Sequence, residues 1–220
     1  MELKIPSLEE LREIYHEDMK EAFPAAELKP LAAIEKMWRE GWYKPYCLYD
    51  DDGAGPIGTA FLWLGHPGWA LLDYLCVTAS WRNDGFGAEI LRMLHEMEPE
   101  TVIFGEAEAP VHAPDPAMAE RRLGFYARCG LRTAGYDTEM FGVHYKTLYL
   151  ANREVADEDL MAEHQFVYRN SFTPEKYEKY VRIPFDPEAA PGESFHPDPA
   201  SDTLYPPARQ KSLPVHSSLS

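Results

Sequence analysis

The sequence feature that most constrains the fold is a strand, a glycine-containing turn and a helix between residues 71 and 97. The apolar run from Leu71 to Val77 has the length of a buried strand, and apolar residues recur at helical spacing from Ile90 to Met97. Between them lies the segment 82–88, RNDGFGA. The first amides of a helix have no internal partners, and the helix dipole favours negative charge there. The segment therefore predicts a site for a ligand that carries a diphosphate.

The residues of this segment suit such a ligand. Gly85 and Gly87 remove side chains that would keep a phosphate from the backbone amides, and Arg82 adds a permanent cation with a forked set of donors. The spacing excludes a P-loop, because no Lys-Ser or Lys-Thr follows the glycines, and it also differs from the G-x-G-x-x-G dinucleotide fingerprint. A plain strand-to-helix connection beside an exposed arginine is the alternative for these residues taken alone.

Two segments together resemble the GNAT superfamily of acyl-CoA N-acyltransferases. The pattern R-x-x-G-x-G after a strand that ends in Val is similar to the acyl-CoA-binding motif of that family. Residues 119–131, AERRLGFYARCGL, resemble the later family helix that ends in F-Y-x-x-x-G-F/L. The resemblance covers residues 71–131 as motif and about residues 1–150 as architecture.

The resemblance implies an α/β fold: a mixed, mostly antiparallel central sheet flanked by helices. Residues 1–150 would form the acetyltransferase domain, and the aromatic residues of 151–185 predict an extension packed on it as a helix and an added strand. Residues 186–220 are rich in proline and serine, which predicts a flexible tail. The expected elements are a helix opened by a Ser7–Glu10 capping box and ended at Pro24, a helix over 31–41, strands 45–50, 57–64 and 69–77, a helix over 85–97, a strand over 101–108, a helix over 117–129 and a hairpin of 131–136 with 143–150.

The implied activity is transfer of an acetyl group from acetyl-CoA directly to a primary amine of a small molecule. The implied CoA-binding residues are Cys76, Val77, Arg82, Asn83, Asp84, Gly85, Phe86, Gly87 and Ala88. Two of them depart from the family pattern. Asn83 can replace glycine because asparagine tolerates left-handed backbone angles. Asp84 would repel a pyrophosphate unless its carboxylate points to solvent.

Tyr126 matches the family position whose phenol lies near the CoA sulfur, and the resemblance implies that it protonates the leaving thiolate. A phenol with a pKa near 10 is protonated at neutral pH and can donate. The alternative is an aromatic residue that packs against Phe125. Cys76 is interpreted as a packing residue rather than a nucleophile, because free cysteines are commonly buried.

Two carboxylates are candidates for the general base. Glu106 falls on one face of its strand with Glu108 and with core residues, at the end that would open into a cleft. Asp73 is a single charge within an apolar strand. The alternative is a structural role, in which Asp73 forms a hydrogen bond to a loop or an ion pair with Arg121 or Arg122. Glu106 is narrowly favoured.

The formal net charge is −16, of which residues 186–220 contribute only −3. Such a balance argues against nucleic-acid partners and would attract a cationic amine, although it can equally serve solubility alone. No apolar run is long enough to span a membrane, the histidines lack metal-ligand spacing, and three cysteines suit a reducing cytoplasm. A homodimer is a possible assembly. The alternatives to a small-molecule enzyme are a non-catalytic acyl-CoA-sensing module and a protein lysine or N-terminal acetyltransferase.

Overall fold

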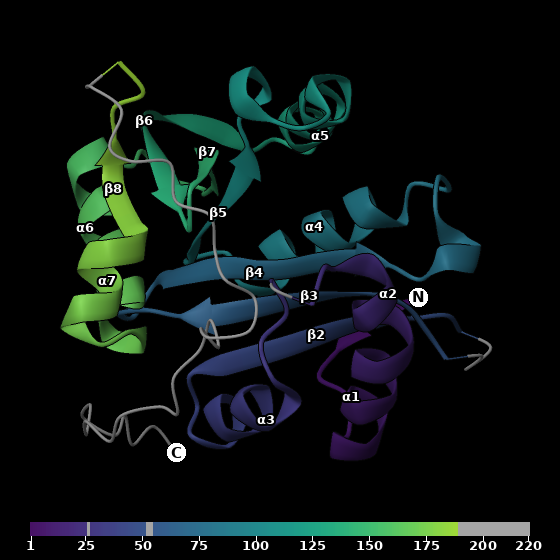
Figure 1. The fold of residues 1–220 in the computed structure, drawn as a ribbon. Coiled ribbons are helices and arrows are strands. Elements are labelled where there is room, and N and C mark those ends of the chain that lie inside the picture. The colour runs from purple at the N-terminus through teal and green to yellow at the C-terminus, as the bar shows by residue number, and fades with distance from the viewer. Residues whose placement is uncertain (26, 52–54, 189–220) are drawn as a thin grey trace.

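A mixed β-sheet with helices on both faces makes up the molecule (Figure 1). The computed structural model describes residues 1–25, 27–51 and 55–188. Over these residues the sheet has eight strands in the order β1-β2-β3-β4-β5-β7-β6-β8. The strands are β1 (Glu2–Lys4), β2 (Tyr43–Tyr49), β3 (Pro56–Leu64), β4 (Trp69–Val77), β5 (Val102–Glu108), β6 (Arg132–Met140), β7 (Val143–Leu150) and β8 (Val181–Phe185). The predicted fold class is confirmed.

The helices also lie where the sequence predicts them, with a few differences. They are α1 (Leu8–Ile14), the π-helical turn η1 (Tyr15–Met19), α2 (Lys20–Ala22), α3 (Leu31–Arg39), the 3₁₀ turn η2 (Ala79–Trp81), α4 (Phe86–Met97), the 3₁₀ turn η3 (Pro110–His112), α5 (Pro116–Arg128), α6 (Asp157–Ser171) and α7 (Pro174–Tyr180). The capping box is confirmed, because the Ser7 hydroxyl accepts from the Glu10 amide and the Glu10 carboxylate accepts from the Ser7 amide. The prediction of one continuous first helix was wrong, since a π-helical turn interrupts it.

The central strands β4 and β5 pair in parallel over a short distance and then separate. Their backbones are in register only from Trp69 to Leu71 on β4 and from Val102 to Phe104 on β5. Beyond these residues, β4 is paired only with β3 and β5 only with β7. The edges of β4 and β5 that face each other have no partner strand among the described residues. We call the space between these edges the split. Figure 1 shows β5 turning away from β4 on the side where α4 and α5 lie.

Two apolar clusters lie on opposite faces of the sheet. One is formed under α4 and α5 and includes Ile90, Leu94 and Ile103. The other lies under α1, α3 and α6, and Phe61 and Phe104 are among its fully buried side chains. The alternation of apolar residues along the strands therefore fills two separate cores, one on each face of the sheet.

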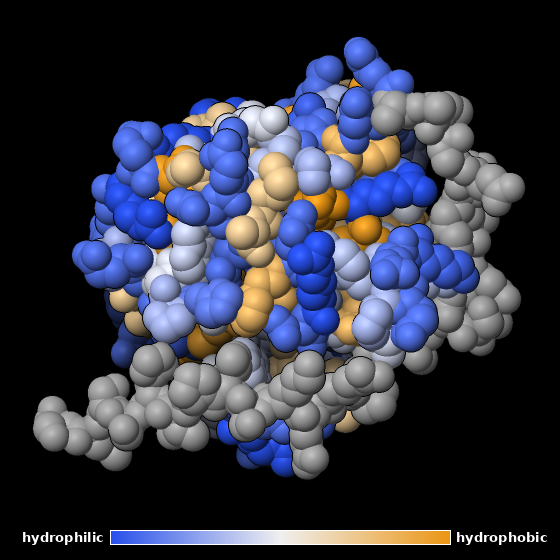
Figure 2. Space-filling model, turned by 90° about the vertical axis from the view of Figure 1, so that its left-hand side faces the viewer, coloured by the Kyte–Doolittle hydropathy of each residue, from blue (hydrophilic) through white to orange (hydrophobic). Residues whose placement is uncertain are grey.

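Residues 151–185 form α6, α7 and β8, and β8 extends the sheet by pairing with β6. Figure 2 shows this side of the molecule, where hydrophilic side chains predominate and apolar patches lie between them. Helix α6 is also tied to the turn between β3 and β4, because Glu163 accepts from the His66 amide (2.7 Å) and lies 2.8 Å from its ring Nδ1. The tail predicted for 186–220 falls outside the described residues from 189 onward. Within the described ranges, no helix is both long and apolar enough to cross a bilayer.

Candidate active site

The predicted phosphate-binding turn connects the end of β4 to α4 at the open end of the split. Asn83 has φ of 73° and Gly85 has φ of 87°, so both adopt the left-handed conformation. Asn83 therefore adopts the left-handed conformation that the sequence predicts for it in place of a glycine. Gly85 is the N-cap residue of α4, no side chain caps the helix there, and nothing lies within 4 Å of where its Cβ would be. The start of α4 is therefore open at Gly85, and no side chain accepts from its first amides.

The two segments that carry the family resemblance touch each other. A Cβ on Gly87 would lie 3.3 Å from Cζ of Phe125 and 3.7 Å from Cγ2 of Val77. A side chain at residue 87 would crowd Phe125, so Gly87 allows α4 to pack closely against α5 at this point. The contact brings the segment that contains Tyr126 next to the turn.

Arg82 and Asp84 are both exposed side chains of this turn. The Arg82 Nε donates to the carbonyl oxygen of Val77 (3.1 Å), and its Nη2 lies 3.1 Å from Oε1 of Glu21 on α2. An ion pair so open to water contributes little, so the guanidinium can exchange Glu21 for a phosphate at small cost. Asp84 makes no ion pair with another described residue, and its solvent exposure is the condition under which it does not oppose an anion.

An open hollow of about 300 Å³ lies along the unpaired edge of β4, beside this turn. Its lining comes from the end of β4, from α2 and from the turn: Glu21, Ala22, Leu75, Cys76, Val77 and Arg82. The hollow therefore runs from the end of β4 to Arg82, the residue at which the turn begins. This arrangement can take a ligand with a phosphate at one end and an extended, hydrogen-bonding arm.

Tyr126 lies on α5 and is partly buried. Burial raises the pKa of its phenol, the nearby Arg122 opposes that shift, and Cys129 adds to it. Its hydroxyl makes no hydrogen bond to any other residue in the described part of the chain. A protonated phenol without an internal acceptor is available to an incoming group.

Glu106 is held by two donors from α6. Its Oε1 lies 2.6 Å from His164 Nε2 and accepts from the Tyr168 hydroxyl at 2.9 Å. The Glu106 side chain is 14% exposed and the His164 side chain is fully buried. The backbone of Glu106 is paired with that of Thr147 on β7, which lies on the other side of β5 from the split. The carboxylate that the sequence favours as the base is therefore positioned by partners that the sequence analysis did not name.

Asp73 occupies the residue at which the β3–β4 register shifts, and it binds a buried lysine. Lys29 Nζ lies 2.7 and 2.8 Å from the two Asp73 carboxylate oxygens, and the Tyr43 hydroxyl also donates to Asp73. Burial lowers the pKa of Lys29, and the charge of Asp73 opposes this shift. Of the two structural alternatives, a partner from a loop is confirmed, because Lys29 lies in the loop between α2 and α3, and a pair with Arg121 or Arg122 was wrong.

Cys76 is buried, and burial raises the pKa of its thiol to about 12, with Asp18 adding to the shift and Arg82 opposing it. Burial likewise raises the pKa of Cys47 to about 12. A thiol of this kind is almost entirely protonated at neutral pH and is a poor nucleophile. The structure thus agrees with Cys76 as a packing residue.

Thiol labelling tests this assignment. At pH 8 a thiol with a pKa of about 12 is ionised in about one molecule in 10,000. We therefore expect an aromatic disulfide reagent to modify Cys129, which is only partly buried, well before Cys47 and Cys76. The latter two should react only after denaturation. Equal rates for all three thiols in the folded protein would contradict the burial of Cys76.

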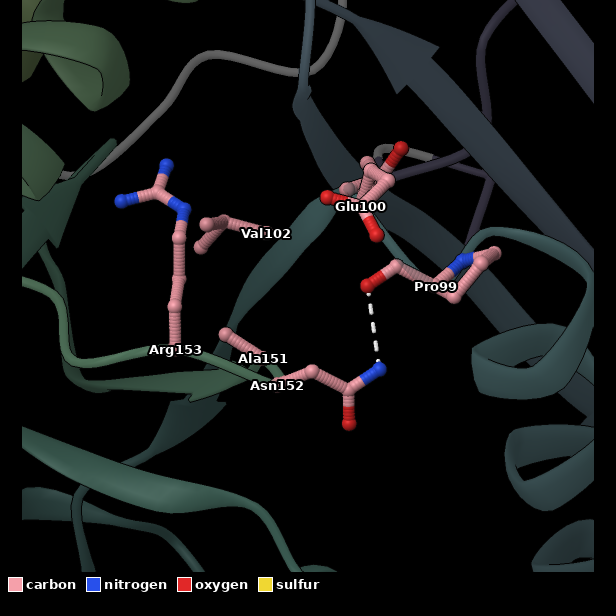
Figure 3. Close-up of a pocket in the computed structure, with 7 residues that line it drawn as sticks. Pro99, Glu100, Val102, Ala151, Asn152 and Arg153 are labelled. Carbon is pink, nitrogen blue, oxygen red and sulfur yellow. Dashed lines mark hydrogen bonds between the residues drawn. The ribbon is translucent and has the colours of Figure 1, made fainter.

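The second hollow lies elsewhere, where β4 and β5 begin, and has a volume of about 110 Å³ (Figure 3). Asn152 donates from Nδ2 to the Pro99 carbonyl (3.0 Å) within it, and the Arg153 guanidinium lies 5.1 Å from the Trp69 ring. This hollow contains none of the predicted site residues. No group of three or more histidine, cysteine, aspartate or glutamate side chains suited to a metal ion occurs among the described residues.

Comparisons with known proteins identify the fold. No protein-family model matches the sequence, and neither does any curated protein. Among solved structures, a Bacteroides thetaiotaomicron protein described as a GNAT-family acetyltransferase is similar with a TM-score of 0.61 and 21% identity, over 75% of this chain and 95% of that one. The spermidine N-acetyltransferase of Vibrio cholerae in complex with CoA and spermine is similar with a TM-score of 0.53 and 13% identity, over 68% and 94%. This chain therefore has the fold of the GNAT acetyltransferases.

Proposed function

We propose that the protein is an acetyl-CoA-dependent N-acetyltransferase that acts on a primary amine of a small molecule. The observation that carries the proposal is the split between β4 and β5, with an uncapped helix N-terminus at the end of β4. Unpaired strand edges inside a sheet leave backbone groups without partners, and such groups must find hydrogen bonds. The pantetheine arm of CoA has amide groups that can provide them, and its pyrophosphate suits the helix end.

The residues around the split supply what acetyl transfer requires. When bound, acetyl-CoA supplies a thioester whose carbonyl carbon is open to attack by an amine. Successive amides of a strand point to opposite edges, so one amide near Cys76 and Val77 faces the split, and in this proposal it stabilises the oxyanion that develops. Glu106 accepts the proton that the amine loses, and Tyr126 donates a proton to the leaving thiolate. Cys76 takes no part as a nucleophile, so the transfer is direct.

Acidic and aromatic side chains lie around Glu108, at the end of β5, and we take this as the side on which the amine acceptor binds. Burial raises the pKa of Glu27, with Arg122 lowering it and Glu108 raising it, which places these three groups near one another. Tyr145 stands opposite Glu108 in the β5–β7 register. Carboxylates on this side attract a cationic amine. The Vibrio cholerae enzyme, whose fold is similar, was solved with spermine. We accordingly place polyamines within the first set of acceptors to test.

Binding and turnover test the two halves of the proposal separately. Calorimetry should show saturable binding of acetyl-CoA, and absence of binding at millimolar concentration would exclude the donor half. Release of the CoA thiol should then be followed across a panel of amines that includes polyamines, amino sugars and amino acids. Thiol release that depends on one amine supports the enzyme, whereas binding without release supports a non-catalytic module. That alternative is favoured by the fact that Glu106 and Asp73 already have internal partners.

Arg82 gives a quantitative prediction for the donor half. Replacing Arg82 by Ala should raise the dissociation constant of acetyl-CoA about 10- to 150-fold, because hydrogen bonds to a charged group contribute about 1.5–3 kcal/mol. Arg92→Ala is the matched control: Arg92 lies on α4, the helix that follows the turn, and pairs with Glu89 and Glu96 instead. It should leave the affinity unchanged. Equal effects of the two variants would contradict a phosphate contact at Arg82.

The remaining expectations concern location and assembly. The cysteines Cys47, Cys76 and Cys129 form no disulfide. This agrees with a reducing compartment, and we place the protein in the cytoplasm. One structure of the Vibrio cholerae spermidine N-acetyltransferase is dodecameric. A homodimer of the present protein stays a prediction.

A further inference from the structure

Helix α6, which follows the last strand of the predicted acetyltransferase domain, brings two polar side chains to Glu106. His164 and Tyr168 lie one helical turn apart, so both face the sheet. Both reach the same oxygen: Oε1 of Glu106 lies 2.6 Å from His164 Nε2 and 2.9 Å from the Tyr168 hydroxyl. These residues are separated from Glu106 by 58 and 62 positions in the chain.

The hydrogen-bond partners determine which atoms carry protons. An ionised carboxylate only accepts hydrogen bonds, so His164 Nε2 and the Tyr168 hydroxyl are the donors. His164 Nδ1 lies 3.2 Å from the Tyr136 hydroxyl, which can donate to it. With the Tyr136 hydroxyl donating to Nδ1, the proton that His164 donates to Glu106 is on Nε2. Glu106 Oε1 has two donors, while Oε2 bonds to none of the residues that the structure describes.

The surroundings of His164 and Tyr168 leave them little freedom. The His164 ring is 0% exposed and meets the Phe104 ring edge-on at a centroid distance of 5.1 Å. The centroids of the Tyr168 and Trp63 rings are 6.1 Å apart. The Trp63 ring also contacts Lys29, whose Nζ lies 4.3 Å from the ring centroid. Rings packed in this way keep their hydrogen-bonding atoms in one place.

We propose that His164 and Tyr168 are positioning residues for acetyl transfer, so that α6 is part of the active site. They hold Glu106 by Oε1 and leave Oε2 to take the proton from the attacking amine. As that proton moves to Oε2, the bond from amine nitrogen to acyl carbon forms, the carbon–sulfur bond breaks, and the thiolate takes the Tyr126 proton. Water then takes the proton from Glu106 and returns a proton to Tyr126. This inference rests on the proposed function and adds to it the contribution of residues 151–185.

Two substitutions at His164 test the proposal. His164→Gln keeps an amide N–H near the position of Nε2, whereas His164→Leu keeps the bulk and removes the donor. We expect His164→Leu to lower kcat about 100-fold and His164→Gln to stay within about fivefold of the wild type. The KM for acetyl-CoA should change less than about threefold in both variants, because His164 does not line the hollow beside β4. A purely structural role would lower kcat and the donor affinity together.

Tyr168→Phe keeps the test decisive if His164→Leu does not fold, since it removes one hydroxyl from a packed ring. It should lower kcat about tenfold with an unchanged KM for acetyl-CoA. Wild-type kcat in His164→Leu or in Tyr168→Phe would overturn the proposal. Equal losses in His164→Gln and His164→Leu would also overturn it, because the imidazole itself would then transfer the proton. If the wild type binds acetyl-CoA but releases no thiol with any amine, the proposed function fails first and this inference falls with it.

Discussion

Replacing Tyr126 by Phe is expected to lower kcat about 100-fold while leaving the dissociation constant of acetyl-CoA within about threefold, since general acid catalysis contributes about 10²- to 10⁴-fold. The phenol lies on α5, next to Phe125, and Phe125 packs against Gly87 of the phosphate-binding turn. Its hydroxyl has no hydrogen-bond partner in the described part of the chain, so its removal breaks no internal contact. The loss should therefore fall on the chemical step, which single-turnover kinetics can isolate.

A second phenol provides the control for this prediction. Tyr46 lies on β2 and its hydroxyl donates to Glu98 at 2.6 Å, away from the split. Tyr46→Phe should leave kcat unchanged even if it lowers stability. A thioester with a better leaving group, such as an acetylated aromatic thiol, should also restore much of the rate of Tyr126→Phe. If the substitution has no effect on kcat, the phenol is only a packing residue.

Replacing Lys29 by Met is expected to reduce the free energy of unfolding by about 3–5 kcal/mol, because the removal of one partner leaves the other charge buried without compensation. The Lys29 side chain is 1% exposed and that of Asp73 is 9% exposed. Tyr43 would be left as a donor to Asp73, which is too little to replace a bidentate ammonium. Urea denaturation followed by tryptophan fluorescence measures the change.

Two further variants identify the cause of this loss. Lys36→Met removes a half-exposed lysine of α3 that lies 3.9 Å from Glu40, and it should change stability by less than about 0.5 kcal/mol. The double variant Lys29→Met with Asp73→Leu should recover much of the stability, since replacing both members of a buried pair is far less costly than removing one. A single variant with the urea midpoint of the wild type would show that the pair does not hold β4 in place.

Local patterns predict the parts of this protein whose cause is local. The capping box at Ser7, the left-handed Asn83 and the turn at Gly85 each follow from residues within four positions of one another. The mixed, mostly antiparallel sheet followed from the family resemblance, but its strand order and the split beside the one parallel pair were not predicted. The short strand β1 was missed, because three residues carry no readable alternation.

The partners of the two carboxylates could not be predicted in this way. Periodicity shows which face of a strand a side chain occupies, and it correctly grouped Glu106 with Phe104. It does not show which residue from another element will meet it. Lys29 lies 44 positions from Asp73, in a loop without a repeating pattern. The one available signal was the charge itself: an aspartate inside an apolar strand requires a buried partner, and its identity depends on the folded chain.

Neighbouring residues of α6 hold different parts of the sheet. Glu163 binds the turn that leads into β4, and His164 binds Glu106 on β5. The two strands that border the split share only a short backbone register, so this helix acts as a crosspiece between them. The angle at which the strands diverge then depends on how α6 is seated. Substitutions that tilt α6 would therefore change the width of the split without altering any residue that lines the hollow.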